Sequence, residues 1–134
     1  MLLRVLAYLW ASPVTAIGLL FVPLAWLSGG GAWVVCGAIE VHGGLVAALL
    51  RRGLPVLGPP AAMTLGHVIL GRDRSCLDYS RRHEHVHVRQ YERWGLLLVP
   101  VYLIASCVLY TQGLDPYLDN PFEREAFAED RRAA

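Results

Sequence analysis

The stretch His83-Glu84-His85-Val86-His87 decides how the rest of the chain is interpreted. Residues i and i+4 lie on one face of an α-helix, so His83 and His87 can direct two imidazoles at one metal ion. Glu84 stands where its carboxylate can act as a general base toward water, whereas His85 points roughly 200° away around the helix. The spacing predicts a metal-binding helix, and a solvated, histidine-rich helix face without metal is the alternative.

The helix that carries this stretch is predicted to run from Arg81 to about Arg93. Asp78 and Ser80 are both candidate N-cap residues, because their side-chain oxygens can accept hydrogen bonds from the first backbone amides of a helix. Gly95 is expected to weaken or end the helix.

The segments before this helix predict a small sheet of two to three strands. Residues 33–42 and 63–70 are rich in β-branched side chains, and each run is followed by glycine. Residues 45–50 are apolar and ambiguous between helix and strand, and residues 54–60 contain three prolines and predict a loop. Strands and helices in this order predict the α+β class.

Two apolar runs bear on the topology of the chain. Val5 to Leu27 is longer than the roughly 20 residues that cross a bilayer, and Pro13 and Pro23 predict a kink or a break in it. A cleaved signal peptide and a buried core helix are the alternatives to a membrane anchor. The second run, Leu96 to Tyr110, is only about 15 residues long, which is marginal for spanning.

A catalytic zinc ion takes three protein ligands, so two histidines are not enough. His42 and His67 lie on predicted strands, where a histidine is more often an ordinary polar residue than a ligand. A later helix, from Pro121 to about Asp130, carries two acids, Glu123 and Glu125. A carboxylate completes His₂Glu zinc sites, so either acid is a candidate third ligand.

The start of that later helix has its own capping pattern. Asn120 is a candidate N-cap, Pro121 fits the first helical position and Glu123 occupies the third. Glu123 could therefore close a capping box with Asn120 instead of binding a metal.

The two motifs together resemble a known family. The pattern H-E-x-x-H-x-x-Q over residues 83–90, an apolar helix, and N-P-x-E-x-E-A over residues 120–126 are similar to the small glutamate-zincin domains of bacterial proteins. The second motif also resembles the E-x-x-A-D segment of membrane-bound zinc peptidases, with Phe127 in place of the aspartate. The resemblance covers roughly residues 63–130.

This resemblance implies a zinc cofactor and a division of roles. It implies that His83, His87 and Glu123 hold the zinc ion and that Glu84 is the catalytic base. Glutamate-zincins are metallopeptidases, so the resemblance implies a peptide or protein substrate.

Four further residues are candidates for contacting the substrate or supporting a ligand. Gln90 shares a helix face with His87 and could hydrogen-bond a ligand or the substrate. Tyr91, like Tyr117, could stabilise an oxyanion, and His67 could serve that role instead. The strand over residues 63–70 could pair with an extended peptide.

The second apolar run places a condition on this site. If Leu96 to Tyr110 crossed a membrane, His87 and Glu123 would emerge on opposite sides and could not share a metal. We therefore predict that this run does not span, and that it packs on the signature helix and returns Glu123 to the same side.

Composition narrows the class of protein. Hydrophobic residues make up 55% of the 134 residues, and the net charge of +1 gives no reason to expect a nucleic-acid partner. The three cysteines form no disulfide framework and no paired-cysteine metal motif. The segment from Arg51 to Arg93 contains eight arginines and four acidic residues. This excess of positive charge favours the cytoplasmic side for this part of a bacterial inner-membrane protein.

The sequence therefore predicts three segments. Residues 1–28 form a kinked membrane anchor in contact with lipid, residues 29–62 a strand and linker region, and residues 63–134 a zincin-like metal-binding domain. The predicted function is a membrane-anchored, zinc-dependent metallopeptidase-like hydrolase. The alternative is a non-catalytic membrane protein that has a structural or degenerate metal site and acts through protein partners.

Overall fold

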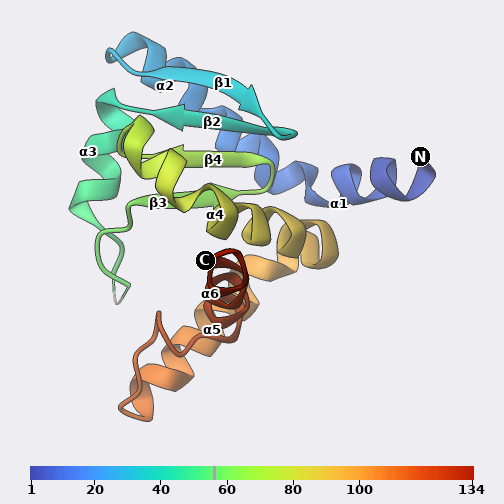
Figure 1. Cartoon of the computed structure of the whole chain (residues 1–134), viewed down its shortest axis with the longest axis vertical. Coiled ribbons are helices and arrows are strands. Elements are labelled where there is room, and N and C mark those ends of the chain that lie inside the picture. Colours follow the sequence, from blue (N-terminus) through green and yellow to red (C-terminus); the bar gives the residue numbers. More distant parts are fainter. Residues whose placement is uncertain (56) are drawn as a thin grey trace.

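The computed structural model describes residues 1–55 and 57–134 and combines helices with one four-stranded mixed sheet (Figure 1). This confirms the predicted α+β class. The elements in chain order are α1 (Leu2–Leu19), α2 (Phe21–Leu27), β1 (Gly31–Val35), β2 (Ala38–His42), α3 (Gly44–Arg52), β3 (Ala62–Leu65), β4 (Val68–Gly71), α4 (Arg74–Trp94), the 3₁₀ turn η1 (Gly95–Leu97), α5 (Leu98–Thr111) and α6 (Pro121–Ala133).

The sheet has four strands, not the two to three expected, because each predicted strand is a hairpin. Cys36 and Gly37 turn β1 into β2 with positive φ angles of 49° and 84°, and Gly66 (φ 64°) begins the turn from β3 to β4. β-branched residues fill both arms of each hairpin, so the short turns do not interrupt the strand pattern of the sequence. The strand order is β1-β2-β4-β3, with β2 and β4 parallel, which leaves β3 at an edge.

Alternation along the strands divides the sheet into two faces. One face packs on α2 and α3 through an apolar cluster of buried residues, which are Ala25, Val41, Val46, Leu50, Val68 and Leu70. The opposite face meets α4 through a cross-strand row, Trp33, Glu40, Ile69 and Thr64. The ambiguous run at residues 45–50 is thus helical, because as α3 it covers the apolar face.

The first apolar run forms two helices, α1 and α2, separated at Leu20. Pro13 inside α1 has no N–H to donate to the carbonyl of Leu9, and the Ser12 hydroxyl donates to that carbonyl instead, at 2.7 Å. Pro23 lies in the first turn of α2, where a missing N–H costs least. The expected break is confirmed.

The middle of α1 packs against the rest of the fold. Ala11, Val14 and Gly18 are buried, and a Cβ on Gly18 would come within 2.7 Å of the Val68 side chain. The outer part of α1 projects from the body of the molecule and exposes apolar side chains (Figure 1). By length and composition, two helical stretches, Leu2–Leu27 and Arg74–Thr111, could cross a membrane.

Helix α4 begins at Arg74, almost two turns before the predicted start, and the N-cap is neither Asp78 nor Ser80. The cap is Asp73, whose carboxylate accepts a hydrogen bond from the Cys76 amide at 2.8 Å. The early start is stabilised by Leu77, which is 1% exposed and packs on the sheet. This contact with the sheet is not visible in local sequence.

The chain turns back after α5 through a set of hydrogen bonds. The Ser106 hydroxyl donates to the Pro116 carbonyl at 2.8 Å, and the Asn120 amide donates to Ser106 at 2.9 Å and to the Tyr102 carbonyl at 3.2 Å. Asn120 also caps α6 by accepting from the Phe122 amide. Helix α6 therefore starts partway back along α5 and runs against α4.

Candidate metal centre

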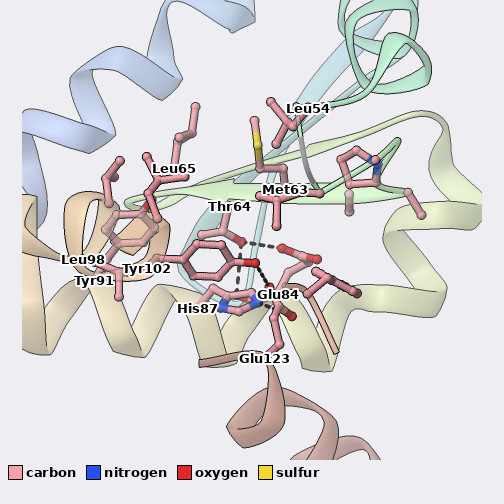
Figure 2. Close-up of a pocket in the computed structure, with 18 of the residues that line it drawn as sticks. Leu54, Met63, Thr64, Leu65, Glu84, His87, Tyr91, Leu98, Tyr102 and Glu123 are labelled. Carbon is pink, nitrogen blue, oxygen red and sulfur yellow. Dashed lines mark hydrogen bonds and ion pairs between the residues drawn. The ribbon is translucent and has the colours of Figure 1, made fainter. Parts of the chain in front are cut away.

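A pocket of about 570 Å³ lies where α4, β3, α5 and the start of α6 meet (Figure 2). Its polar wall includes Glu84, His87, Tyr102 and Glu123, and most of the remaining lining is apolar. Glu84 and His87 come from the buried face of α4, and Glu123 from the first turn of α6. The pocket is therefore where the two sequence motifs meet.

The two histidines of the motif converge on one carboxylate oxygen. His83 Nε2 lies 2.8 Å from Glu123 Oε2, and His87 Nε2 lies 3.4 Å from the same oxygen. With metal–ligand bonds of about 2.0–2.2 Å in a tetrahedral site, ligand atoms stand about 3.3 Å apart. The two observed distances are close to that value, so the donor atoms can close on a zinc-sized ion with small side-chain movements.

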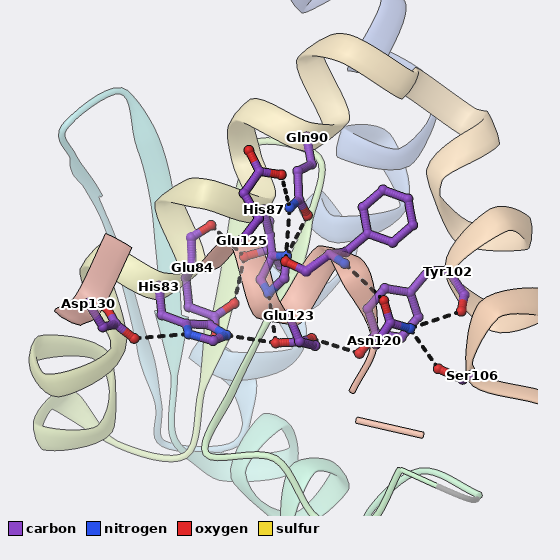
Figure 3. A network of polar contacts seen from close by, with 12 residues as sticks. His83, Glu84, His87, Gln90, Tyr102, Ser106, Asn120, Glu123, Glu125 and Asp130 are labelled. Carbon is purple, nitrogen blue, oxygen red and sulfur yellow. Dashed lines mark hydrogen bonds and ion pairs between the residues drawn. The ribbon is translucent and has the colours of Figure 1, made fainter. Parts of the chain in front are cut away.

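The other ring nitrogen of each histidine is held by a separate acceptor (Figure 3). His83 Nδ1 lies 3.1 Å from Asp130 Oδ2, and His87 Nδ1 lies 2.8 Å from Gln90 Oε1. Because a carboxylate and an amide oxygen accept, both Nδ1 atoms carry hydrogen and donate. Both Nε2 atoms therefore face Glu123, which is the orientation that metal-binding histidines need.

Gln90 is fixed from its other end as well. It is fully buried, and its amide donates to the Phe122 carbonyl at 3.0 Å and to Glu125 at 2.8 Å. Glu125 also accepts from Arg93 at 2.6 Å. Glu125 is thus part of the support for His87 and lies outside the three-residue ligand group.

The charges in this cluster hold one another in place. Burial by itself would raise the pKa of Glu123, but hydrogen bonds from His83 and His87 outweigh it and lower the pKa to about 2. Burial likewise opposes charge on His87, yet Glu123 and Glu84 raise its pKa to about 9. The metal-free cluster is therefore a carboxylate facing a protonated imidazole near neutral pH.

The second oxygen of Glu123 has its own partner. The Tyr102 hydroxyl of α5 donates to Oε1 at 2.6 Å, while Oε2 faces the histidines. Glu123 is only 4% exposed, and this hydrogen bond fixes which of its oxygens faces the two histidines. The capping box is not formed: the backbone N–H of Asn120 donates to the Tyr117 carbonyl, and the Glu123 carboxylate binds His83 and Tyr102 instead.

Glu84 lines the same pocket and is not part of the ligand group. The Thr64 hydroxyl donates to its carboxylate at 2.8 Å, and the side chain is buried beside the edge strand. Burial raises the pKa of Glu84 above its ordinary value. A carboxyl group with a raised pKa is suited to taking up and returning a proton.

The remaining predicted residues fall in different places. Tyr91 lines the pocket and is buried. His67 is not brought to the pocket: its Nε2 lies 3.1 Å from Glu92, its Nδ1 3.3 Å from Thr15, and its ring stacks on Tyr8. His67, which lies in the turn between β3 and β4, thus joins α1 to α4.

The arginine that precedes the motif has a structural partner. Arg81 binds Glu40 of β2 with two hydrogen bonds, of 2.7 Å and 2.9 Å, and Glu40 is 1% exposed. This bidentate pair ties α4 to the face of the sheet that α4 covers. Arg81 is therefore directed away from the metal centre and adds no positive charge to it.

Sequence reasoning missed three residues of the site, which are Thr64, Tyr102 and Asp130. Thr64 and Tyr102 carry no local signal, because their roles depend on which elements pack together. Asp130 had a signal in principle, since it lies seven residues, or two helical turns, after Glu123 and shares its face. It supplies the carboxylate that the E-x-x-A-D pattern lacks at Phe127.

The chain was also compared with known proteins. No family model, no curated protein and no solved structure matches it.

Proposed function

We propose that this protein is a zinc-dependent hydrolase that cleaves peptide bonds, with His83, His87 and Glu123 as the metal ligands. The observation that carries the proposal is the convergence of both Nε2 atoms on Glu123 Oε2 at 2.8 Å and 3.4 Å, with Glu84 in the same pocket. Two imidazoles and one carboxylate are the ligands of hydrolytic zinc sites that keep a position open. When bound there, zinc acts as a Lewis acid and makes water nucleophilic near neutral pH.

The side chains around the site have complementary tasks in this proposal. Glu84, held by Thr64, takes the proton of the attacking water and returns it to the leaving amine. Tyr102 keeps the ligand oxygen of Glu123 directed at the histidines. Asp130 and Gln90 hold the two imidazoles in the tautomer with free Nε2.

The apolar helices support a membrane location for this activity. The outer part of α1 exposes Leu2, Leu3, Leu6 and Leu9, each more than half exposed, which water solvates poorly. We propose that this part of α1 inserts into a bacterial inner membrane and that the metal centre lies on the cytoplasmic side. The arginines between residues 51 and 93 favour this orientation.

The experiment compares the full-length protein with Glu84→Gln, His83→Ala and His85→Gln in detergent. Zinc content is measured by mass spectrometry and peptidase activity with a quenched-fluorescent peptide library. We expect Glu84→Gln to keep one zinc and lose activity by roughly 100-fold or more, the usual contribution of a general base. His83→Ala should lose both zinc and activity, and His85→Gln, on the opposite helix face, should keep both.

Two results would contradict the proposal. Wild-type protein without stoichiometric zinc excludes the metal centre. If the wild-type protein holds zinc but cleaves no peptide, and Glu84→Gln behaves like the wild type in every assay, the hydrolase is excluded. The protein would then bind a metal without catalysing a reaction.

A further inference from the structure

The pocket beside the metal centre has mostly apolar walls. Side chains from the 54–61 loop, from β3 and from α5 surround it, and they include Leu54, Leu57, Met63, Leu65, Val99 and Leu103. Among the described lining residues, only Glu84, His87 and Glu123 carry charge, and all three belong to the centre itself. No described lining residue is an arginine, and the imidazole of His87 faces Glu123, so the walls of the pocket away from the centre offer no cation to a phosphate or a carboxylate of a ligand.

Two arginines of the neighbouring helix α4 form ion pairs with residues outside the apolar wall of the pocket. Arg81 is paired with Glu40, and Arg93 with Glu125. The walls away from the centre are therefore matched to an uncharged, apolar part of a ligand, because an anionic group placed against them would lose its hydration without gaining a partner.

The rim of the pocket continues into the apolar exterior of the molecule. Leu54 and Leu103 line the pocket and are also 38% and 49% exposed. Next to Leu103 on the same helix, Ile104 and Val108 are exposed, as are Leu96 and Leu97 of η1. An apolar segment that lies along the exposed leucine, isoleucine and valine side chains of α5 would meet the pocket at Leu103.

The edge strand β3 indicates that the ligand is a polypeptide. The Arg72 amide donates to the Ala61 carbonyl, so the alternation of an antiparallel pair turns the backbone of Ala62 and Thr64 away from β4. Those backbone groups border the pocket and can pair with an extended peptide (Figure 2). A lipid acyl chain would leave them without partners.

We infer that the substrate is an apolar, uncharged polypeptide segment that enters from the lipid side of α5, with Leu103 contributing to its selection. This rests on the proposed function, because it names the substrate class of the same centre. It assigns to α5 a surface role in addition to its packing against the start of α6.

The test uses full-length, zinc-loaded protein and quenched-fluorescent peptides that differ only at their centre, with leucine and phenylalanine, aspartate, or arginine. We expect kcat/KM for the apolar peptide to exceed that for the charged peptides by about 10- to 100-fold, the range expected for burying one large side chain. Leu103→Glu should abolish most of this preference. The matched control Ile104→Glu changes an exposed residue that does not line the pocket and should keep the preference.

A second measurement addresses the direction of entry. The protein is reconstituted in phosphatidylcholine vesicles with the apolar peptide either free or tethered by a palmitoyl chain. Faster cleavage of the tethered peptide supports entry from the lipid side, and equal or slower cleavage overturns it.

The outcomes separate this inference from the proposed function. Equal kcat/KM for apolar and charged peptides overturns the inference and leaves the hydrolase standing. If no peptide is cleaved, fluorescence anisotropy with zinc-loaded Glu84→Gln protein decides: preferential binding of the apolar peptide supports the inference, and equal or no binding overturns it.

Discussion

Zinc binding to the metal-free protein should release at least one proton near neutral pH. Glu123 holds the pKa of His87 at about 9, so at pH 7 that imidazole is almost fully protonated, whereas a metal ligand must be neutral. Glu123, with a pKa of about 2, is already ionised and releases nothing. The pKa of His83 is raised as well, because Glu123 outweighs the opposing effect of burial, so the total lies between one and two protons.

The cost of this proton release can be worked out from the pKa. At pH 7, about two units below the pKa of His87, removing the proton costs about 2 × 1.36, or about 2.7 kcal/mol. The apparent dissociation constant for zinc at pH 7 is therefore raised roughly 100-fold relative to that of the fully deprotonated site. Affinity should rise about tenfold for each pH unit between pH 7 and the pKa of His87, and more steeply where His83 also loses its proton.

Isothermal titration calorimetry measures the released protons directly. The observed enthalpy of zinc binding is plotted against the ionisation enthalpy of several buffers, and the slope gives the number of protons. The matched control is His85→Gln, which removes a histidine of the same helix that lies outside the ligand group, and it should leave the slope unchanged. A slope below about half a proton at pH 7 refutes the charge pairing of His87 with Glu123.

Three further predictions concern support, stability and pH. Asp130→Asn should weaken zinc affinity by roughly 10- to 100-fold, measured by competition with a chelator, because His83 loses its carboxylate acceptor. Gly66→Ala should lower Tm in thermal unfolding, since φ is +64° and the added Cβ would collide with α1, whereas Gly113→Ala (φ +73°, open space) should cost less. In metal-free protein, the raised pKa of His87 contributes stability that is complete below about pH 6.5 and is lost as the pH rises through about 9. Tm of chelator-treated protein should therefore be lower above about pH 9 than at about pH 6.5, and an equal or higher Tm above about pH 9 would contradict this.

Much of the candidate site could be predicted from local sequence. The spacing of His83 and His87 needs only helical geometry to place them on one face, and Asn120-Pro121 marks the start of α6 by capping chemistry alone. The break in the first apolar run follows from proline in the same way. These predictions hold because each depends on residues within one or two turns of each other.

The hairpins and the true start of α4 could not be predicted in this way. When strand-forming residues lie on both sides of a short turn, the sequence pattern predicts one long strand instead of a hairpin. The N-cap of α4 is Asp73 and not a later residue because Leu77 packs on the sheet. Contacts between distant elements decide such cases, and local propensity is too weak to replace them.

Sequence by itself determined the chemistry available to this protein: two imidazoles and a neighbouring carboxylate on one helix, a downstream acid, and apolar helices around them. Tertiary structure alone decided that Glu123 and not Glu125 faces the histidines, and that Asp130, Tyr102 and Thr64 support the centre. The physical reason is that α5 and its return through Ser106 and Asn120 set how α6 lies against α4. A rotation of α6 by one residue, about 100°, would present a different side chain to the same two imidazoles.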